Sequence, residues 1–130
     1  RTDPNQNPGI SIQGCKLDAA SDLVPVQSSF ETYLGRPWKE YSRTVIMQSN
    51  LGALIDPAGW LEWSGDFALT TLYYGEYKNR GPGSNTTRRV AWRGFRLINA
   101  TAEANNFTVA NFIHGDQWLA ATNIPFSLGL

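Results

Sequence analysis

The spacing of the strand-forming segments constrains the fold of this 130-residue chain more than any other feature. Apolar or alternating runs typical of β-strands occupy residues 9–17, 43–48, 72–77 and 90–99, on average roughly every 25–30 residues. The long connections between them contain no Asn-Gly or Asp-Gly pair of the kind that closes a tight hairpin. Parallel strands need long connections, whereas antiparallel neighbours can be joined by two residues. The spacing therefore favours parallel pairing.

The segments between the strands narrow the architecture further. They contain no clear helical period, which argues against a doubly wound α/β sheet. A solenoid of parallel strands and an irregular sandwich both remain, because no strict sequence repeat decides between them. After residue 99 the pattern changes to short helical stretches, with Thr108 as a candidate N-cap. We therefore expect a single unit with strands and loops over 1–99 and a helical tail over 100–130.

Charge and composition exclude several classes of protein. Eleven basic and eleven acidic residues give a formal net charge of zero, which argues against a general nucleic-acid or membrane-surface binder. No run of about 18 apolar residues is long enough to span a bilayer. Aromatic residues make up 12% of the chain, which argues against disorder. The chain starts with Arg1 and has no signal peptide, so we expect a processed product or a piece of a longer chain.

Few residues are available for acid–base or metal chemistry. His114 is the only histidine and Cys15 the only cysteine, so neither a zinc site nor a Ser-His-Asp triad is expected. Phosphate-binding and dinucleotide-binding glycine motifs are also absent. We expect no metal and no cofactor. A basic cluster is interpreted as a solvated strand face, with an anionic polymer as the alternative ligand; it comprises Arg88, Arg89, Arg93 and Arg96.

The most distinctive chemistry lies around Arg36. Pro37 stiffens the backbone and biases Arg36 towards extended geometry, and Trp38 follows directly. Arginine can hold a carboxylate through two parallel hydrogen bonds, and an indole face suits the C–H groups of a sugar ring. Trp60 and Trp63 add further indoles after a turn. Sugar binding and simple core packing both account for these tryptophans.

Three N-glycosylation sequons lie within about 25 residues, at Asn85, Asn99 and Asn106, and they favour a secreted protein. In a secreted protein, an odd cysteine such as Cys15 suggests a partner outside the chain or a free thiol. The alternative is a buried cysteine that acts as a small hydrophobic residue.

Long ordered motifs resemble plant pectin methylesterases. They are YLGRPWKEYSRT at residues 33–44, GWLEWSGDFAL at 59–69 and LYYGEYKNRGPG at 72–83. The opening RTDPNQN at 1–7 is also similar, so the resemblance covers essentially the whole chain. It implies an all-β fold, a right-handed parallel β-helix with short C-terminal helices. It also implies a secreted cell-wall enzyme that hydrolyses methyl esters of polygalacturonate to acidic pectin and methanol, without metal or cofactor.

The resemblance assigns roles to particular residues. Arg36 matches the arginine that holds the nucleophilic aspartate of the family, and Trp38 matches the substrate-stacking tryptophan. Trp63 matches a second aromatic residue of the cleft. The motifs that carry the two catalytic aspartates of this aspartyl esterase are absent from the chain, and the oxyanion glutamines would precede Arg1. Cys15 falls where the family places one half of a disulfide whose partner lies upstream.

These observations leave more than one function open. In the first interpretation, the chain is the C-terminal part of a pectinesterase and is inactive alone, because removal of a nucleophile costs orders of magnitude in rate. In the second, it is a non-catalytic fragment that binds pectin through Arg36 and the tryptophans. A structural fragment without ligand is a third. The expected partners are methylesterified homogalacturonan and a proteinaceous pectinesterase inhibitor, with no nucleic acid and no membrane.

Overall fold

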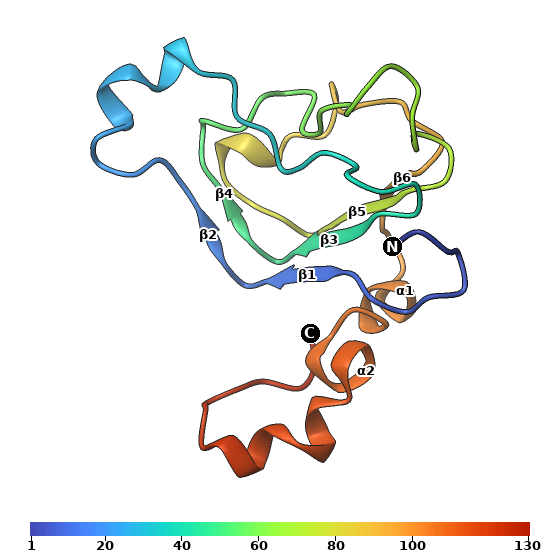
Figure 1. Ribbon diagram of the computed structural model, residues 1–130. Helices are drawn as coiled ribbons and strands as arrows, with labels where there is room; N and C mark the ends of the chain where they lie inside the picture. The colour runs from blue at the N-terminus through green and yellow to red at the C-terminus, as the bar shows by residue number, and fades with distance from the viewer.

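Four parallel strands form one sheet in the computed structural model, which describes residues 1–130 (Figure 1). In spatial order they are β1 (Ile10–Gln13), β3 (Arg43–Met47), β5 (Tyr73–Tyr77) and β6 (Phe95–Leu97). The register sets Ile12 beside Ile46 and Ile46 beside Glu76. The long connections predicted from the sequence thus return the chain to the same edge after each turn, and every strand pairs in parallel.

Two further faces complete each turn of the chain. A second parallel pair joins β2 (Lys16–Leu17) to β4 (Asn50–Leu51), and a parallel bridge joins Asn50 to Arg80. On a third face, Thr32 forms a parallel bridge with Ile55. Three stacked faces with parallel pairing on each define a right-handed parallel β-helix, so the predicted fold is confirmed and the sandwich alternative is wrong.

Each turn of the β-helix, called a coil below, bends at the same corner, between the face that carries β1, β3 and β5 and the face that carries β2 and β4. Gly14, Gln48 and Lys78 occupy it with positive φ values of 65°, 52° and 47°. Because the backbone turns here, the predicted strand over 9–17 is divided into β1 and β2. The next residues form a ladder: the Ser49 N–H donates to Asn79 Oδ1 (3.0 Å), and the Cys15 N–H donates to Ser49 Oγ (3.1 Å).

The central strand is buried on both faces. Val45, Ile46 and Met47 are all 0% exposed. On the inner face, Ile46 packs into a cluster that fills the coils, which also contains Leu51, Ile55, Trp60, Leu72 and Tyr74. On the outer face, Val45 and Met47 pack in a second cluster with Tyr77, Ile98, Ala104 and Phe107. Burial on both faces explains the continuous apolar run of this strand.

Short helices cover the outer face of the sheet (Figure 1). They are α1 (Thr101–Asn105) and α2 (Val109–Ile113), followed by the 3₁₀ turns η3 (Gly115–Gln117) and η4 (Leu119–Thr122). Thr108 occupies the N-cap position of α2, but its hydroxyl donates to Asn105 O (2.8 Å) and caps no N–H. Two more 3₁₀ turns, η1 (Val24–Ser29) and η2 (Pro82–Ser84), lie in loops. None of the helices is long and apolar enough to cross a membrane.

An ion pair lies inside the coils, where the sequence suggested a solvated face. Arg89 Nε donates to Glu76 Oε1 at 2.8 Å, and both side chains are 2% exposed. Arg89 also donates to the carbonyl oxygens of Pro57 and Gly83, while the Trp60 indole N–H donates to Glu76 Oε1 at 3.2 Å. The interpretation of the arginine cluster as solvated is therefore wrong for Arg89, because Glu76 points into the core and needs a buried cation. Arg88, Arg93 and Arg96 are exposed.

Candidate functional site

Two loops bring Arg36, Trp38 and Trp63 together; we call these three residues the Arg–Trp cluster. The loops are joined by backbone hydrogen bonds from the Leu34 N–H to Gly59 O (2.7 Å) and from the Leu61 N–H to Gly35 O (3.1 Å). Pro37 is buried between its two exposed neighbours, so the backbone of this segment is anchored while the side chains on either side point outwards.

The guanidinium of Arg36 is held on one side only. Its Nε and Nη2 donate to Glu62 O at 3.0 and 2.8 Å, and Nη2 also donates to Trp63 O at 3.1 Å. Its Cζ lies 5.0 Å from the centre of the Trp63 ring. No acceptor in the chain pairs with Nη1. The cation is therefore fixed in direction and keeps N–H donors for a further acceptor.

Trp38 and Trp63 form an exposed aromatic surface. Their ring centroids are 6.3 Å apart and their planes differ by 9°, which is an offset stack. Trp38 is 73% exposed and Trp63 is 47% exposed, which is unusual for side chains of this size. Trp60 differs from both: it is 1% exposed and packs against Tyr74 with ring centroids 4.3 Å apart. Core packing is therefore the correct interpretation for Trp60 alone.

A hollow of about 450 Å³ adjoins the Arg–Trp cluster and reaches the start of β1. Its lining contains four basic side chains, Arg1, Arg36, Lys39 and Arg43, and no aspartate or glutamate. Tyr74 also lines it, and burial raises the pKa of Tyr74 to about 12, so its hydroxyl is neutral at ordinary pH and does not serve as a base. The hollow can attract an anion or hold a carboxylate, but it contains no acidic side chain for nucleophilic or acid–base chemistry.

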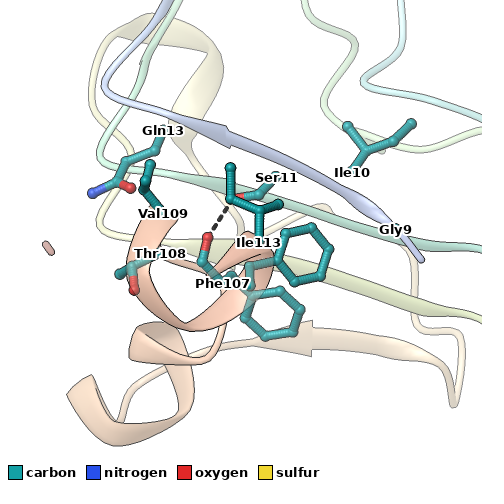
Figure 2. A pocket seen from close by; sticks show the side chains of 9 residues that line it. Gly9, Ile10, Ser11, Gln13, Phe107, Thr108, Val109 and Ile113 are labelled. Carbon is teal, nitrogen blue, oxygen red and sulfur yellow. Dashed lines mark hydrogen bonds between the residues drawn. The ribbon is translucent and has the colours of Figure 1, made fainter. Parts of the chain in front are cut away.

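A second hollow, of about 350 Å³, lies between β1 and α2 (Figure 2). Ser11 Oγ donates to Phe107 O at 2.6 Å, and the apolar side chains of Ile10 and Ile113 are among those that line the hollow. No titratable side chain lines this hollow, so it offers no reactive group. The Arg–Trp cluster is therefore the better candidate site.

The other residues singled out in the sequence are dispersed. Asn85, Asn99 and Asn106 are all exposed and lie apart from the Arg–Trp cluster in the chain. Cys15 is exposed, and its Sγ lies 3.3 Å from Gln13 O. His114 is exposed at the C-terminus of α2 and lines none of the hollows described above. No three His, Cys, Asp or Glu side chains lie close enough together to hold a metal ion.

Sequence reasoning missed Arg1, Lys39, Arg43 and Tyr74, which line the hollow beside the Arg–Trp cluster. Lys39 directly follows Trp38, so its place in the motif could have indicated it. Tyr74 comes from β5 and pairs in register with Thr44, which also lines the hollow. Only the strand register, which the sequence does not supply, brings Tyr74 to this position.

The fold and the site define a parallel β-helix protein with a basic, tryptophan-bearing surface, chemistry that suits an acidic polysaccharide. The family model described as Pectinesterase matches residues 1–116, and the chain belongs to this family.

The chain is similar to pectinesterases from plants and, at lower identity, to one from Aspergillus niger. Over its full length the chain is 63% identical to "Pectinesterase" of Daucus carota, and 62% identical to "Pectinesterase 2" of Citrus sinensis. It spans 41% and 26% of their lengths. The solved structure "Pectin methylesterase from Carrot" matches the whole chain with a TM-score of 0.98, and the chain covers 41% of it. The Aspergillus niger pectin methylesterase matches 77% of the chain at 33% identity and a TM-score of 0.64.

Proposed function

We propose that this chain is part of a pectin methylesterase, which hydrolyses methyl esters of polygalacturonate to pectate and methanol. The observation that carries the proposal is the Arg–Trp cluster, with a fixed cation beside exposed indoles and a basic hollow. The cation suits carboxylates on a galacturonan chain, and the indoles suit its sugar rings. Family membership and the exposed sequons support a secreted protein that acts on the plant cell wall.

In the proposed mechanism, Arg36 orients the nucleophile but does not react. Its free Nη1 donates to the carboxylate of an aspartate that lies outside residues 1–130. That carboxylate attacks the ester carbonyl, and a second aspartic acid protonates the departing methoxide, which leaves as methanol. Water, deprotonated by the second aspartate, then hydrolyses the acyl-enzyme. The positive charge of Arg36 lowers the pKa of the nucleophile and keeps it ionised.

The tryptophans have a binding role in this proposal. Trp38 and Trp63 pack against the sugar rings beside the reacting ester, and Lys39 attracts acidic units along the polymer. A proteinaceous inhibitor is a proposed partner, because some relatives carry the name "Pectinesterase/pectinesterase inhibitor", among them one from Solanum lycopersicum.

A chimera of this chain and the carrot enzyme, called the joined protein below, tests the proposed function. In it, the matching segment of the carrot pectin methylesterase is exchanged for residues 1–130 of this chain, which covers 41% of that structure. We expect the joined protein to release methanol from methylated pectin at a rate within about tenfold of the carrot enzyme, since the two backbones superpose with a TM-score of 0.98. A folded joined protein without methanol release would overturn the proposal.

Pectin binding without catalysis is a second candidate function, favoured by the fact that Arg36, Trp38 and Trp63 all lie in this chain. Replacing Trp38 by alanine should weaken binding of galacturonan oligomers to the 130-residue chain up to about tenfold, because one stacking contact contributes about 0.5–1.5 kcal/mol. Isothermal titration measures this effect. Phe30→Ala is the matched control, because Phe30 is 60% exposed and lies outside the cluster. Equal affinities of the two variants would count against a stacking role.

A further inference from the structure

The three sequons differ in how the fold presents them. N-linked glycosylation joins an asparagine amide to an oligosaccharide, and the threonine hydroxyl two residues later is part of the recognised sequence. A transferase can act on a folded protein only where both groups lie in an accessible loop. Each sequon can therefore be judged by the exposure and hydrogen bonding of its asparagine and threonine.

The sequon at Asn85 is open. It follows η2 in a loop, and both Asn85 and Thr87 are exposed. The Thr87 N–H donates to Asn85 Oδ1 (2.9 Å), which leaves the Asn85 amide N–H groups and the Thr87 hydroxyl without a partner in the chain. A hollow of about 330 Å³ beside them is lined by Asn85, Thr87 and Arg88, among others, so there is space around both groups.

The sequon at Asn106 is closed, although Asn106 itself is exposed. Thr108 is 1% exposed and its hydroxyl donates to Asn105 O (2.8 Å). Phe107 is 7% exposed and packs against Tyr73 and Phe112, with ring centroids 5.3 and 5.7 Å apart. A transferase could reach this threonine only after Phe107 left the core, so the folded chain hides the recognised part of the sequon.

The sequon at Asn99 is intermediate. Asn99 and Thr101 are exposed, but Thr101 is the first residue of α1. Its hydroxyl lies 3.2 Å from the hydroxyl of Tyr77, which is itself 2% exposed. Recognition of this threonine therefore requires loss of one hydrogen bond, but no unpacking of the core.

We infer that Asn85 is the sequon that the folded chain presents best, and that Asn106 is modified only before the chain folds. The donor is a lipid-linked oligosaccharide pyrophosphate. Asn85 Nδ2 forms a bond to C1 of the first sugar, the bond from C1 to the pyrophosphate oxygen breaks, and the lipid pyrophosphate leaves with the bonding electrons. The amide proton passes to a base of the transferase. Asn99 is modified in the folded chain more slowly than Asn85.

Glycosylation in vitro tests this inference. The folded 130-residue chain and three peptides, one for each sequon, are incubated with oligosaccharyltransferase and its lipid-linked donor, and occupancy is mapped by mass spectrometry. The rate of glycosylation at each site in the folded chain is divided by the rate measured for the peptide that contains the same sequon. We expect Asn85 to exceed Asn106 by at least about tenfold in the folded chain, because Asn106 reacts only through rare local unfolding. The joined protein serves as a second folded substrate.

Variants of Thr87 provide the matched controls. Thr87→Ser keeps the sequon and should keep the modification, whereas Thr87→Ala should abolish it at Asn85 alone. The inference would be overturned if Asn106 were modified in the folded chain within about threefold of Asn85, or if Asn85 reacted about tenfold more slowly in the folded chain than in its peptide.

Discussion

Replacing Arg36 by alanine in the joined protein is expected to lower kcat/KM for methylated pectin by about 100-fold or more. The guanidinium is fixed by two backbone carbonyls, and its remaining donors would hold the nucleophilic carboxylate in line with the ester. Loss of this orientation by about 1 Å can cost about 100-fold in rate. Steady-state methanol release measures the effect.

A pH profile separates this role from a merely structural one. Without the positive charge, the pKa of the nucleophile rises, so the acid limb of the rate profile should move to higher pH in Arg36→Ala. Arg88→Ala removes an exposed charge that lies outside this hollow, and it should leave both kcat and the acid limb nearly unchanged. Arg36→Lys keeps the charge but not the two-pronged geometry, so its acid limb should stay in place while kcat falls. An unchanged pH profile in Arg36→Ala would contradict the proposed role.

Replacing Arg89 by alanine should destabilise the chain by about 3–5 kcal/mol, since it leaves the Glu76 carboxylate buried without its cation. Glu76 is 1% exposed, and the only other side chain that donates to it is Trp60. This loss is a large part of the about 5–15 kcal/mol by which domains are usually stable. Urea denaturation, followed by tryptophan fluorescence, measures the change.

Arg88→Ala is the control for this effect, because Arg88 is an exposed neighbour without the ion pair, and it should change the free energy of unfolding by less than about 0.5 kcal/mol. The double variant Glu76→Leu, Arg89→Met removes both charges together and should recover much of the lost stability. A small effect of Arg89→Ala alone would show that water reaches Glu76 inside the coils.

The strands and their direction were predictable, but the coil corners were not. The strand predicted over 43–48 is present as β3, whose residues Val45, Ile46 and Met47 are buried, and the long connections indicated the observed parallel pairing. The break at Gly14 lies within an apparently continuous alternation, and a single unbroken strand over 9–17 would place Leu17 on the face opposite Ile12. In the structure, both side chains pack against the inner cluster, because the backbone turns between them.

Only those residues of the candidate site that lie within a recognisable sequence motif could be predicted. Arg36 and Trp38 are adjacent to the same proline, and their joint exposure follows from the anchored backbone of Pro37. Trp60 and Trp63 lie three residues apart in one segment, yet only Trp60 is buried, where it packs against Tyr74 and its indole N–H donates to Glu76. Glu76 and Arg89 are polar residues in a core, and hydrophobic patterns do not reveal such pairs.

Methanol release from methylated pectin by the purified 130-residue chain, beside the joined protein, tests the central claim most directly. The basic hollow next to Arg36 contains no aspartate or glutamate, and the proposal places the nucleophile outside this chain. We therefore expect no release above background from the chain alone and steady release from the joined protein. Release by the chain alone that disappears in Arg36→Ala would show that the chain carries its own nucleophile, and it would contradict the proposed division of the active site.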